Sequence, residues 1–169
     1  MPYNCSPLPI SLLKINRLKN FCLILLLLAT SCNTIDLYER TKPFTSHEWK
    51  GAEKPSFIFE ISDTTSLYNI FFVLRHNDAY NYNNIWVNIT TIPPGDTAST
   101  QPLDLKLADN RNGWLGSGMD DIFEHRIKIT RAPLKLKAGK YNFTLQHIMR
   151  EEPLQHVLNA GIRVEKIKQ

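Results

Sequence analysis

The chain has 169 residues, with 20 lysines and arginines against 16 aspartates and glutamates, which gives a formal net charge of +4 at pH 7. Three of the basic residues and none of the acidic ones lie in residues 1–31, so the remaining 138 residues carry 17 basic and 16 acidic side chains. A nearly neutral domain lacks the basic face that nucleic acid binding requires, so we expect no nucleic acid partner. A segment of this length is the size of one ordinary domain.

The first element runs from Lys14 to Cys32 and passes from basic to apolar to small residues. Its apolar part, Phe21 to Ala29, has nine residues, well short of the roughly 20 that span a bilayer. This order is typical of a secretory signal peptide. The residues before Cys32 (Leu-Ala-Thr-Ser) resemble the lipobox of bacterial lipoproteins, whose cysteine is acylated, for example with palmitate, and becomes the first mature residue. We predict removal of residues 1–31 and lipidation of Cys32; the alternative is a buried helix followed by an incidental cysteine.

The mature chain is expected to be one domain close to its anchor. Residues 32–42 are predicted to form the lipidated N-terminus and a short tether, with a first strand at Ile35 to Arg40, and residues 43–169 a single domain. Cys5 and Cys22 lie in the removed segment, so the mature domain has no thiol for a disulfide, a zinc–thiolate site or a nucleophile.

Alternation of apolar and polar residues dominates the mature chain and predicts strands. Leu67 to Arg75 is a nearly continuous apolar run, as expected for a strand covered on both faces. Turn-forming sequences separate the segments, and Glu151 to Asn159 is the one candidate helical turn. The pattern predicts an all-β antiparallel β-sandwich of jelly-roll type with seven to nine strands. The other expected strands are Ser56–Ser62, Ile85–Ile92, Pro102–Leu107, Phe123–Ile129, Tyr141–Ile148 and Gly161–Ile167.

The five histidines show no spacing typical of metal ligands, and no mature cysteine could complete a site. We expect no metal and no cofactor. The histidines are expected to be exposed or at the edge of the core, with His147 partly buried because it lies on the apolar face of a strand. They are His47, His76, His125, His147 and His156.

Catalytic patterns are weak. Ser117 lies in Leu-Gly-Ser-Gly, which lacks the nucleophile elbow of serine hydrolases. Asp120 and Asp121 are adjacent in sequence, which gives no indication that they face each other across a substrate. We therefore expect that the protein is not an enzyme.

Two irregular segments are candidates for binding. Residues 78–86, the first contact loop, interleave aromatic and amide side chains that could stack on sugars or fill a protein interface. Residues 109–121, the second contact loop, combine three glycines with Asp and Asn oxygens and Trp114, but fail the calcium-loop pattern because Arg111 occupies a ligand position. Ordinary structural loops remain the alternative for both. The candidate interaction residues are Tyr80, Tyr82, Trp86, Asp109, Trp114 and Asp120.

Two turns contain Asp-Thr followed by a small residue, at Asp63-Thr64-Thr65 and Asp96-Thr97-Ala98. Both are similar to the motif that Bacteroidetes bacteria O-glycosylate on exported proteins. We therefore predict that Thr64 and Thr97 carry glycan.

The order of these features resembles the gliding-motility lipoprotein family GldH of Bacteroidetes, over essentially the whole mature chain. Each motif is short, but their order and spacing together are specific. They are the lipobox cysteine, Phe57–Asp63 (FIFEISD), Tyr68–His76 (YNIFFVLRH), Tyr80–Trp86 (YNYNNIW), Leu107–Asp109 with Gly113–Gly116, Gly139–Phe143, Met149–Glu151 and Gly161–Arg163.

The resemblance implies a non-enzymatic, membrane-anchored accessory of gliding motility and of the linked type IX secretion, with other envelope proteins of these systems as partners. No catalytic residue follows from it. Surface-exposed lipoproteins of this phylum tend to carry acidic residues just after the lipidated cysteine, whereas Asn33, Thr34 and Ile35 follow here. We therefore expect a domain that faces the periplasm, and outer-membrane sorting is favoured. The alternatives are a carbohydrate-binding sandwich, suggested by the exposed aromatics of the two loops, and an enzyme.

Overall fold

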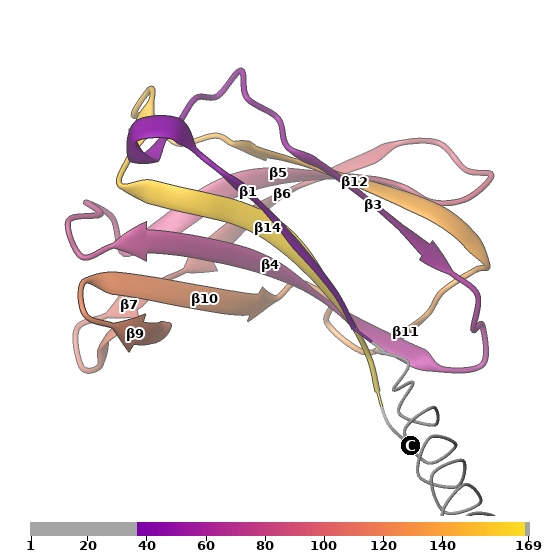
Figure 1. The fold of residues 1–169 in the computed structure, drawn as a ribbon. Helices are drawn as coiled ribbons and strands as arrows, with labels where there is room; N and C mark the ends of the chain where they lie inside the picture. Colours follow the sequence, from indigo (N-terminus) through magenta and orange to yellow (C-terminus); the bar gives the residue numbers. More distant parts are fainter. Residues whose placement is uncertain (1–36, 168–169) are drawn as a thin grey trace, which may run out of the picture. The chain divides into compact units, whose positions relative to one another are not determined.

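Two antiparallel sheets packed face to face make up residues 37–167, the part of the chain that the computed structural model describes (Figure 1). The predicted signal peptide and Cys32 lie outside these residues. The larger sheet has the order β1 (Leu37–Pro43), β14 (Val157–Lys166), β4 (Leu67–Asn77), β10 (Ile122–Lys128) and β9 (Ser117–Met119), with β11 (Leu134–Lys135) also pairing with β4. The smaller sheet has the order β3 (Ser56–Ile61), β12 (Gly139–His147), β5 (Asn84–Ile92) and β6 (Ser99–Lys106).

Two short ribbons and a turn of 3-10 helix complete the described chain. The helical turn η1 (Thr45–His47) follows β1. One ribbon pairs β2 (Glu48–Trp49) with β13 (Leu154–Gln155), and the other pairs β7 (Ala108–Asp109) with β8 (Gly113–Trp114). Within residues 37–167, no helix is long and apolar enough to cross a membrane.

The core lies between the two sheets and follows from the alternation of the strands. In β3, Phe57, Phe59 and Ile61 are buried while the residues between them are exposed. Phe59 lies directly opposite Tyr141 of β12, and the two rings stack with centroids 5.4 Å apart. Burying a side chain of this size contributes about 2–3 kcal/mol, so rows of such pairs hold the sheets together.

The predicted all-β antiparallel sandwich is confirmed, and residues 37–167 contain eight strands of six or more residues. The chain passes repeatedly from one sheet to the other, for example from β3 to β4, from β6 to β10 and from β12 to β14, as in a jelly roll. The expectation that β4 is covered on both faces holds only at its centre, where Phe72, Val73 and Leu74 are all buried.

The predicted helical turn at Glu151 to Asn159 is wrong. Leu154 and Val157 are spaced as on one face of a helix, but each lies in a strand ladder: Leu154 pairs with Trp49, and Val157 pairs with His76. Both side chains are fully buried. Strand pairing with distant parts of the chain therefore overrides the local spacing.

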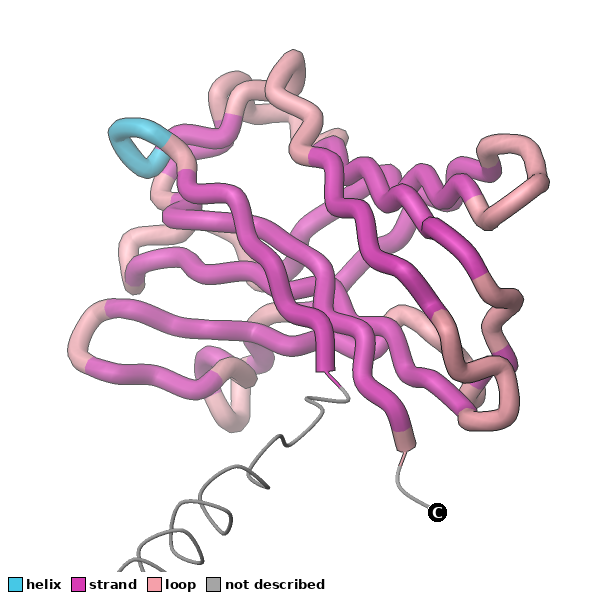
Figure 2. Tube along the Cα trace, turned by 45° about the vertical axis from the view of Figure 1, so that its right-hand side comes forward, coloured by secondary structure: helices cyan, strands magenta, loops and turns pink. Residues whose placement is uncertain are grey.

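All seven residues of β1 pair with β14, so residues 37–43 belong to the larger sheet. Leu37 lies opposite Glu165, so the start of β1 and the end of β14 lie next to each other at one end of the sandwich (Figure 2). We call this the proximal end. Asn77, where β4 ends, lies opposite Ile122 at the other end, the distal end. Ten residue steps of β4 separate the two ends by about 33 Å.

Candidate functional site

The two contact loops lie together at the distal end of the sandwich. The backbone N–H of Leu107, just before the second loop, donates to the carbonyl of Asn83 in the first loop at 2.8 Å. The N–H of Asp78 donates to the carbonyl of Asp121, also at 2.8 Å. Main-chain hydrogen bonds thus join two segments that are far apart in the sequence into one surface.

Asp109 shapes the second loop from within. Its Oδ1 accepts hydrogen bonds from the N–H groups of Arg111 and Asn112, at 3.0 and 2.7 Å. The hydrogen bond from the Asn112 backbone is the main reason that the pKa of the Asp109 carboxyl is lowered. This Asp-centred turn leads into Gly113, whose φ of +66° favours glycine, and so pairs β7 with β8. The ribbon in turn directs Trp114 toward the sandwich.

Trp114 and Tyr80 hold the two loops together by packing. The ring centroid of Trp114 lies 4.4 Å from that of His76 and 5.7 Å from that of Phe123. Tyr80 is only 4% exposed, and its hydroxyl donates to the carbonyl of Asn84 at 3.2 Å. The structure therefore places these two aromatics inside the distal end, where they offer little surface to a partner.

Beneath Trp114, the imidazoles of His76 and His125 contact each other, with their Nε2 atoms 2.9 Å apart. His76 Nδ1 lies 2.7 Å from the carbonyl oxygen of Asn77, which can only accept, so Nδ1 carries the proton. Nε2 of the neutral His76 ring then accepts, and His125 Nε2–H donates. Burial lowers the pKa of both histidines, to about 4 for His125. Residues 37–167 contain no group of three or more potential metal ligands.

The expectation of exposed or core-edge histidines is wrong for His76 and His125, and His147 is more deeply buried than predicted; all three are at most 3% exposed. The reason is the phase of the strands. His76 continues the inward series of Phe72 and Leu74 in β4, and His125 lies opposite Leu74. The same alternation that predicted the strands could have placed these side chains in the core.

Exposed apolar residues gather beside the first contact loop. Trp86 is 42% exposed and Ile148 is 41% exposed, and the two are joined by a hydrogen bond from the Ile148 N–H to the Trp86 carbonyl at 2.9 Å. They form an open groove of about 430 Å³, here called the distal groove, lined by Tyr82, Asn84, Trp86, Ile148, Met149 and Arg150. Met119, in the second loop, is 76% exposed, and Asp120 stands exposed beside it. Aromatic residues, Met and Arg are the types enriched in protein interfaces.

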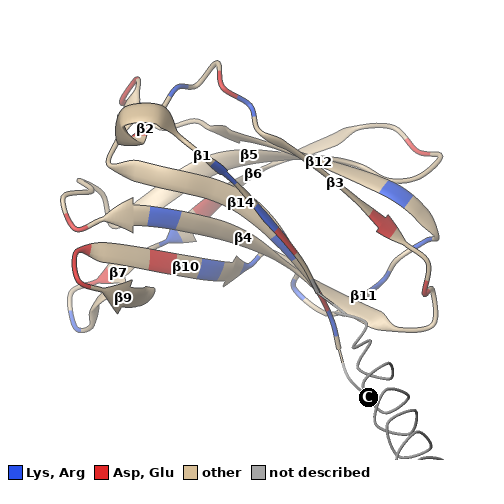
Figure 3. Cartoon of the chain, in the orientation of Figure 1, with Lys and Arg blue, Asp and Glu red and all other residues tan. Residues whose placement is uncertain are grey.

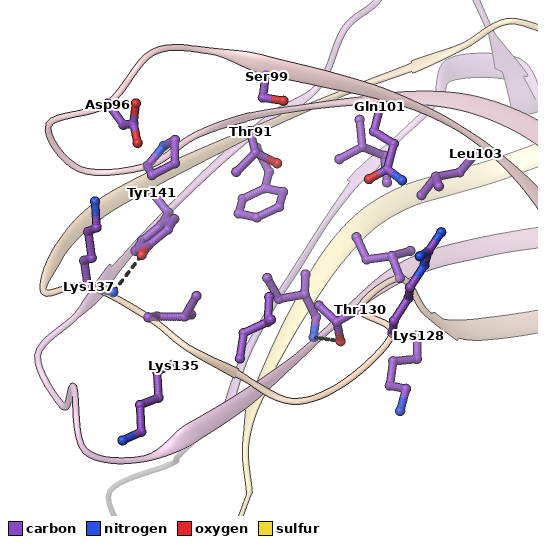
Figure 4. A pocket seen from close by; sticks show the side chains of 18 of the residues that line it. Thr91, Asp96, Ser99, Gln101, Leu103, Lys128, Thr130, Lys135, Lys137 and Tyr141 are labelled. Carbon is purple, nitrogen blue, oxygen red and sulfur yellow. Dashed lines mark hydrogen bonds between the residues drawn. The ribbon is translucent and has the colours of Figure 1, made fainter.

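A larger groove, the edge groove, opens between β6 and residues 128–137 and has a volume of about 710 Å³ (Figure 4). Its floor consists of core side chains, including Ile89, Leu105 and Phe143. The charged residues that line it are exposed at its rim, and an apolar floor with a polar rim is typical of a binding groove. Sequence reasoning missed this groove because its lining comes from separate strands and one connecting segment.

The two predicted glycosylation sites lie at the surface. Thr64 and Thr97 are both exposed in turns. The preceding aspartates organise these turns: Asp63 Oδ1 accepts from the Thr65 N–H, and Asp96 Oδ1 accepts from the Thr97 N–H, each at 2.8 Å.

Two proteins from other bacteria are similar to this chain over more than four fifths of its length. The chain is 27% identical over 150 residues to a protein of Christiangramia forsetii named gliding motility lipoprotein GldH homolog, covering 83% of this chain and 90% of that one. It is 27% identical over 159 residues to gliding motility lipoprotein GldH of Flavobacterium johnsoniae, covering 89% and 98%. Among solved structures, the VP2 subviral particle of infectious bursal disease virus aligns with 76% of this chain and 32% of that chain, at 13% identity and a TM-score of 0.35, too low to support an inference. The model of the GldH lipoprotein family matches residues 36–164, and the chain therefore belongs to that family.

Proposed function

We propose that this chain is a non-catalytic interaction module that gliding motility and the linked type IX secretion require. Membership of a lipoprotein family implies anchoring to a membrane of the cell envelope. The names of both relatives connect the family with gliding motility. In the proposal, the sandwich is a rigid spacer that presents its distal end to other envelope proteins of these systems.

The observation that carries the proposal is the convergence of both contact loops and the distal groove at one end of the sandwich. Five residue steps separate Cys32 from Leu37, so a lipid on Cys32 lies within about 18 Å of the proximal end. The contact loops lie about 33 Å farther along β4. An anchored domain of this shape would hold its exposed apolar groove away from the membrane, where partner proteins could reach it.

The proposal places the anchor in the outer membrane and the domain in the periplasm. The sequence after Cys32 supports this orientation, because Asn33, Thr34 and Ile35 precede the first acidic residue, Asp36. An acidic run would favour surface export, and an Asp directly after the cysteine would disfavour outer-membrane sorting.

Site-specific photocrosslinking in native envelopes tests this function. A photoreactive residue at Trp86 or Met119 samples the distal end, and one at Ile58, which is 61% exposed on β3, is the matched control. We expect gliding or secretion proteins to be recovered by mass spectrometry from the two distal positions and not from the control. Recovery of no such protein, or equal recovery at all three positions, would overturn the proposal.

Carbohydrate binding is the second candidate, because Trp86 and Tyr82 line the distal groove beside the amide of Asn84. Such a groove offers a ring for stacking and an amide for sugar hydroxyls. Titration of the protein with cell-wall and polysaccharide fragments decides this question. Binding that Trp86→Ala weakens would support it, whereas no binding would exclude it.

A further inference from the structure

We propose that the edge groove binds an anionic phospholipid of the anchoring membrane, with an acyl chain on its apolar floor and the headgroup at its basic rim. The inference uses the lipid anchor of the proposed function but is independent of the distal contact surface. Three features of the described residues carry it: the floor, the rim and the position of the groove.

The floor offers core side chains to a ligand. Ile70, Ile89, Leu105 and Phe143 each remain at most 7% exposed although they line the groove. The strand pairing with β4 is interrupted here, because β10 ends at Lys128 and β11 begins only at Leu134. The volume of about 710 Å³ is within the range of small-molecule sites. A flexible apolar chain fits a floor of this kind.

The rim is basic and its charges are unmatched. Lys128, Arg131, Lys135 and Lys137 line it, against the single carboxylate of Asp96 (Figure 4). Among residues 37–167, no carboxylate lies within 4.0 Å of the charged atoms of these four side chains. A bound group with negative charge would complement them.

Lysine or arginine and aspartate or glutamate residues both occur on β1, β14 and β10 of the larger sheet (Figure 3). There, Glu39 accepts from Arg163 at 2.7 Å and from Arg126 at 3.1 Å, and Arg163 also reaches Glu165 at 3.1 Å. Carboxylates of the same domain therefore neutralise Arg126 and Arg163. The four rim cations differ, because no carboxylate of residues 37–167 lies within 4.0 Å of their charged atoms, and an external anion could neutralise them.

The groove lies near the anchor. Leu134 of β11 and Lys166 of β14 both pair with Tyr68 at the start of β4, and Leu37 pairs with Glu165. β11 is thus three strand spacings from the first residue of β1, about 14 Å. Five residue steps allow at most about 18 Å between Cys32 and Leu37, so the proposal places the basic rim at the headgroups of the same membrane. A cluster of lysines near a membrane surface is attracted to anionic lipids.

The test uses the mature lipidated protein in nanodiscs that contain either phosphatidylglycerol or phosphatidylcholine, each with a photoreactive group in an acyl chain. We expect mass spectrometry to find lipid adducts on groove residues such as Leu103 and Ile129, and many more of them with phosphatidylglycerol. The double variant Lys135→Glu with Lys137→Glu should lower labelling by phosphatidylglycerol about fivefold for each lysine removed. Lys50→Glu with Lys54→Glu, which makes the same charge change at exposed lysines outside the groove, should leave it unchanged.

A second variant tests the floor. Gln101 is exposed and lines the groove, so Gln101→Trp should fill the groove without disturbing the core, and acyl adducts should be lost in both lipids. Equal labelling by the two lipids, labelling that survives Gln101→Trp, or a copurified peptide in the groove would overturn the proposal. Protein crosslinking from a photoreactive residue at position 86 is measured separately in the variant with Lys135→Glu and Lys137→Glu. Loss of lipid labelling alone then concerns the edge groove, and loss of protein crosslinks concerns the proposed function.

Discussion

The Nε2 atoms of His76 and His125 face each other at 2.9 Å within the distal end of the sandwich, and one ring donates while the other accepts. Since His76 Nδ1–H donates to the carbonyl of Asn77, protonating His76 at Nε2 would leave two N–H groups facing each other. A second proton on both rings would therefore break the hydrogen bond between them, and burial disfavours a charge on either ring. Trp114 packs on His76, so the state of the pair bears directly on the second contact loop.

This arrangement predicts that acid destabilises the protein. Burial lowers the pKa of His125 to about 4, and the ordinary value of about 6.5 applies in the unfolded chain. The unfolded chain thus binds more protons between these values, and the free energy of unfolding falls as the pH is lowered from about 6.5 to 4, on the order of 2–3 kcal/mol in total. Denaturant unfolding at a series of pH values measures it.

His125→Gln isolates the contribution of the pair, because glutamine retains a donor for His76 and does not titrate. We expect a shallower dependence of stability on pH than in the unchanged protein. His47→Gln, at an exposed histidine, is the control and should change nothing. If the free energy of unfolding depended on pH identically in all three proteins, the His76–His125 pair would not contribute to the acid sensitivity.

The two tryptophans of the contact loops should separate stability from binding. Trp114→Ala removes a ring packed on His76 and Phe123, and should lower the free energy of unfolding by about 3 kcal/mol. Trp86→Ala removes an exposed ring and should lower it by less than about 1 kcal/mol. Thermal or denaturant unfolding measures both. A similar loss for the two variants would contradict the positions assigned to the rings.

Gly161 permits the close approach of β1 to β14. A Cβ at this position would overlap the carbonyl oxygen of Arg40 and would lie 2.7 Å from the Cα of Thr41. Gly161→Ala should therefore displace β1, lower the free energy of unfolding by about 3 kcal/mol and speed hydrogen exchange in residues 37–43. Gly95→Ala, at a turn with open space around it, should have a cost of only about 1 kcal/mol. Unchanged exchange in β1 would refute this account.

Thr64 and Thr97 are exposed next to aspartates that organise their turns, so both should accept glycan. The intact mass of the native protein should exceed that of the lipidated chain, and Thr64→Val with Thr97→Val should remove the difference. A native mass without any increase would rule the modification out.

The strands were predictable from the sequence because alternation records which face is buried, as in Phe57, Phe59 and Ile61. The same rule would have placed His125 in the core within the predicted strand Phe123–Ile129, and His76 by extending the strand Leu67–Arg75 by one residue. The error lay in treating histidine as a surface residue by type. The composition of the two loops predicted that their aromatics contact a partner, whereas Tyr80 and Trp114 turn inward, which depends on packing against rings from other strands.

Two features depend on long-range pairing and could not be obtained locally. Leu154 and Val157 are spaced as in a helix, and only their partners Trp49 and His76 make them strand residues. The edge groove exists because β11 resumes pairing with β4 after an interruption, which brings four basic side chains to the edge facing β6. Neither relationship leaves a periodic pattern in the sequence.

The most direct test of the proposed function is the secretion of a type IX cargo by cells whose only copy of this protein carries Trp86→Glu with Ile148→Glu. Both side chains are exposed, so the variant should accumulate normally, while charges in the distal groove should prevent partner contact. Ile58→Glu, at an exposed position outside the groove, is the control. We expect loss of secretion, and of gliding where the cells glide, only in the groove variant. Normal secretion by this variant at normal abundance would contradict the claim that the distal end is the contact surface.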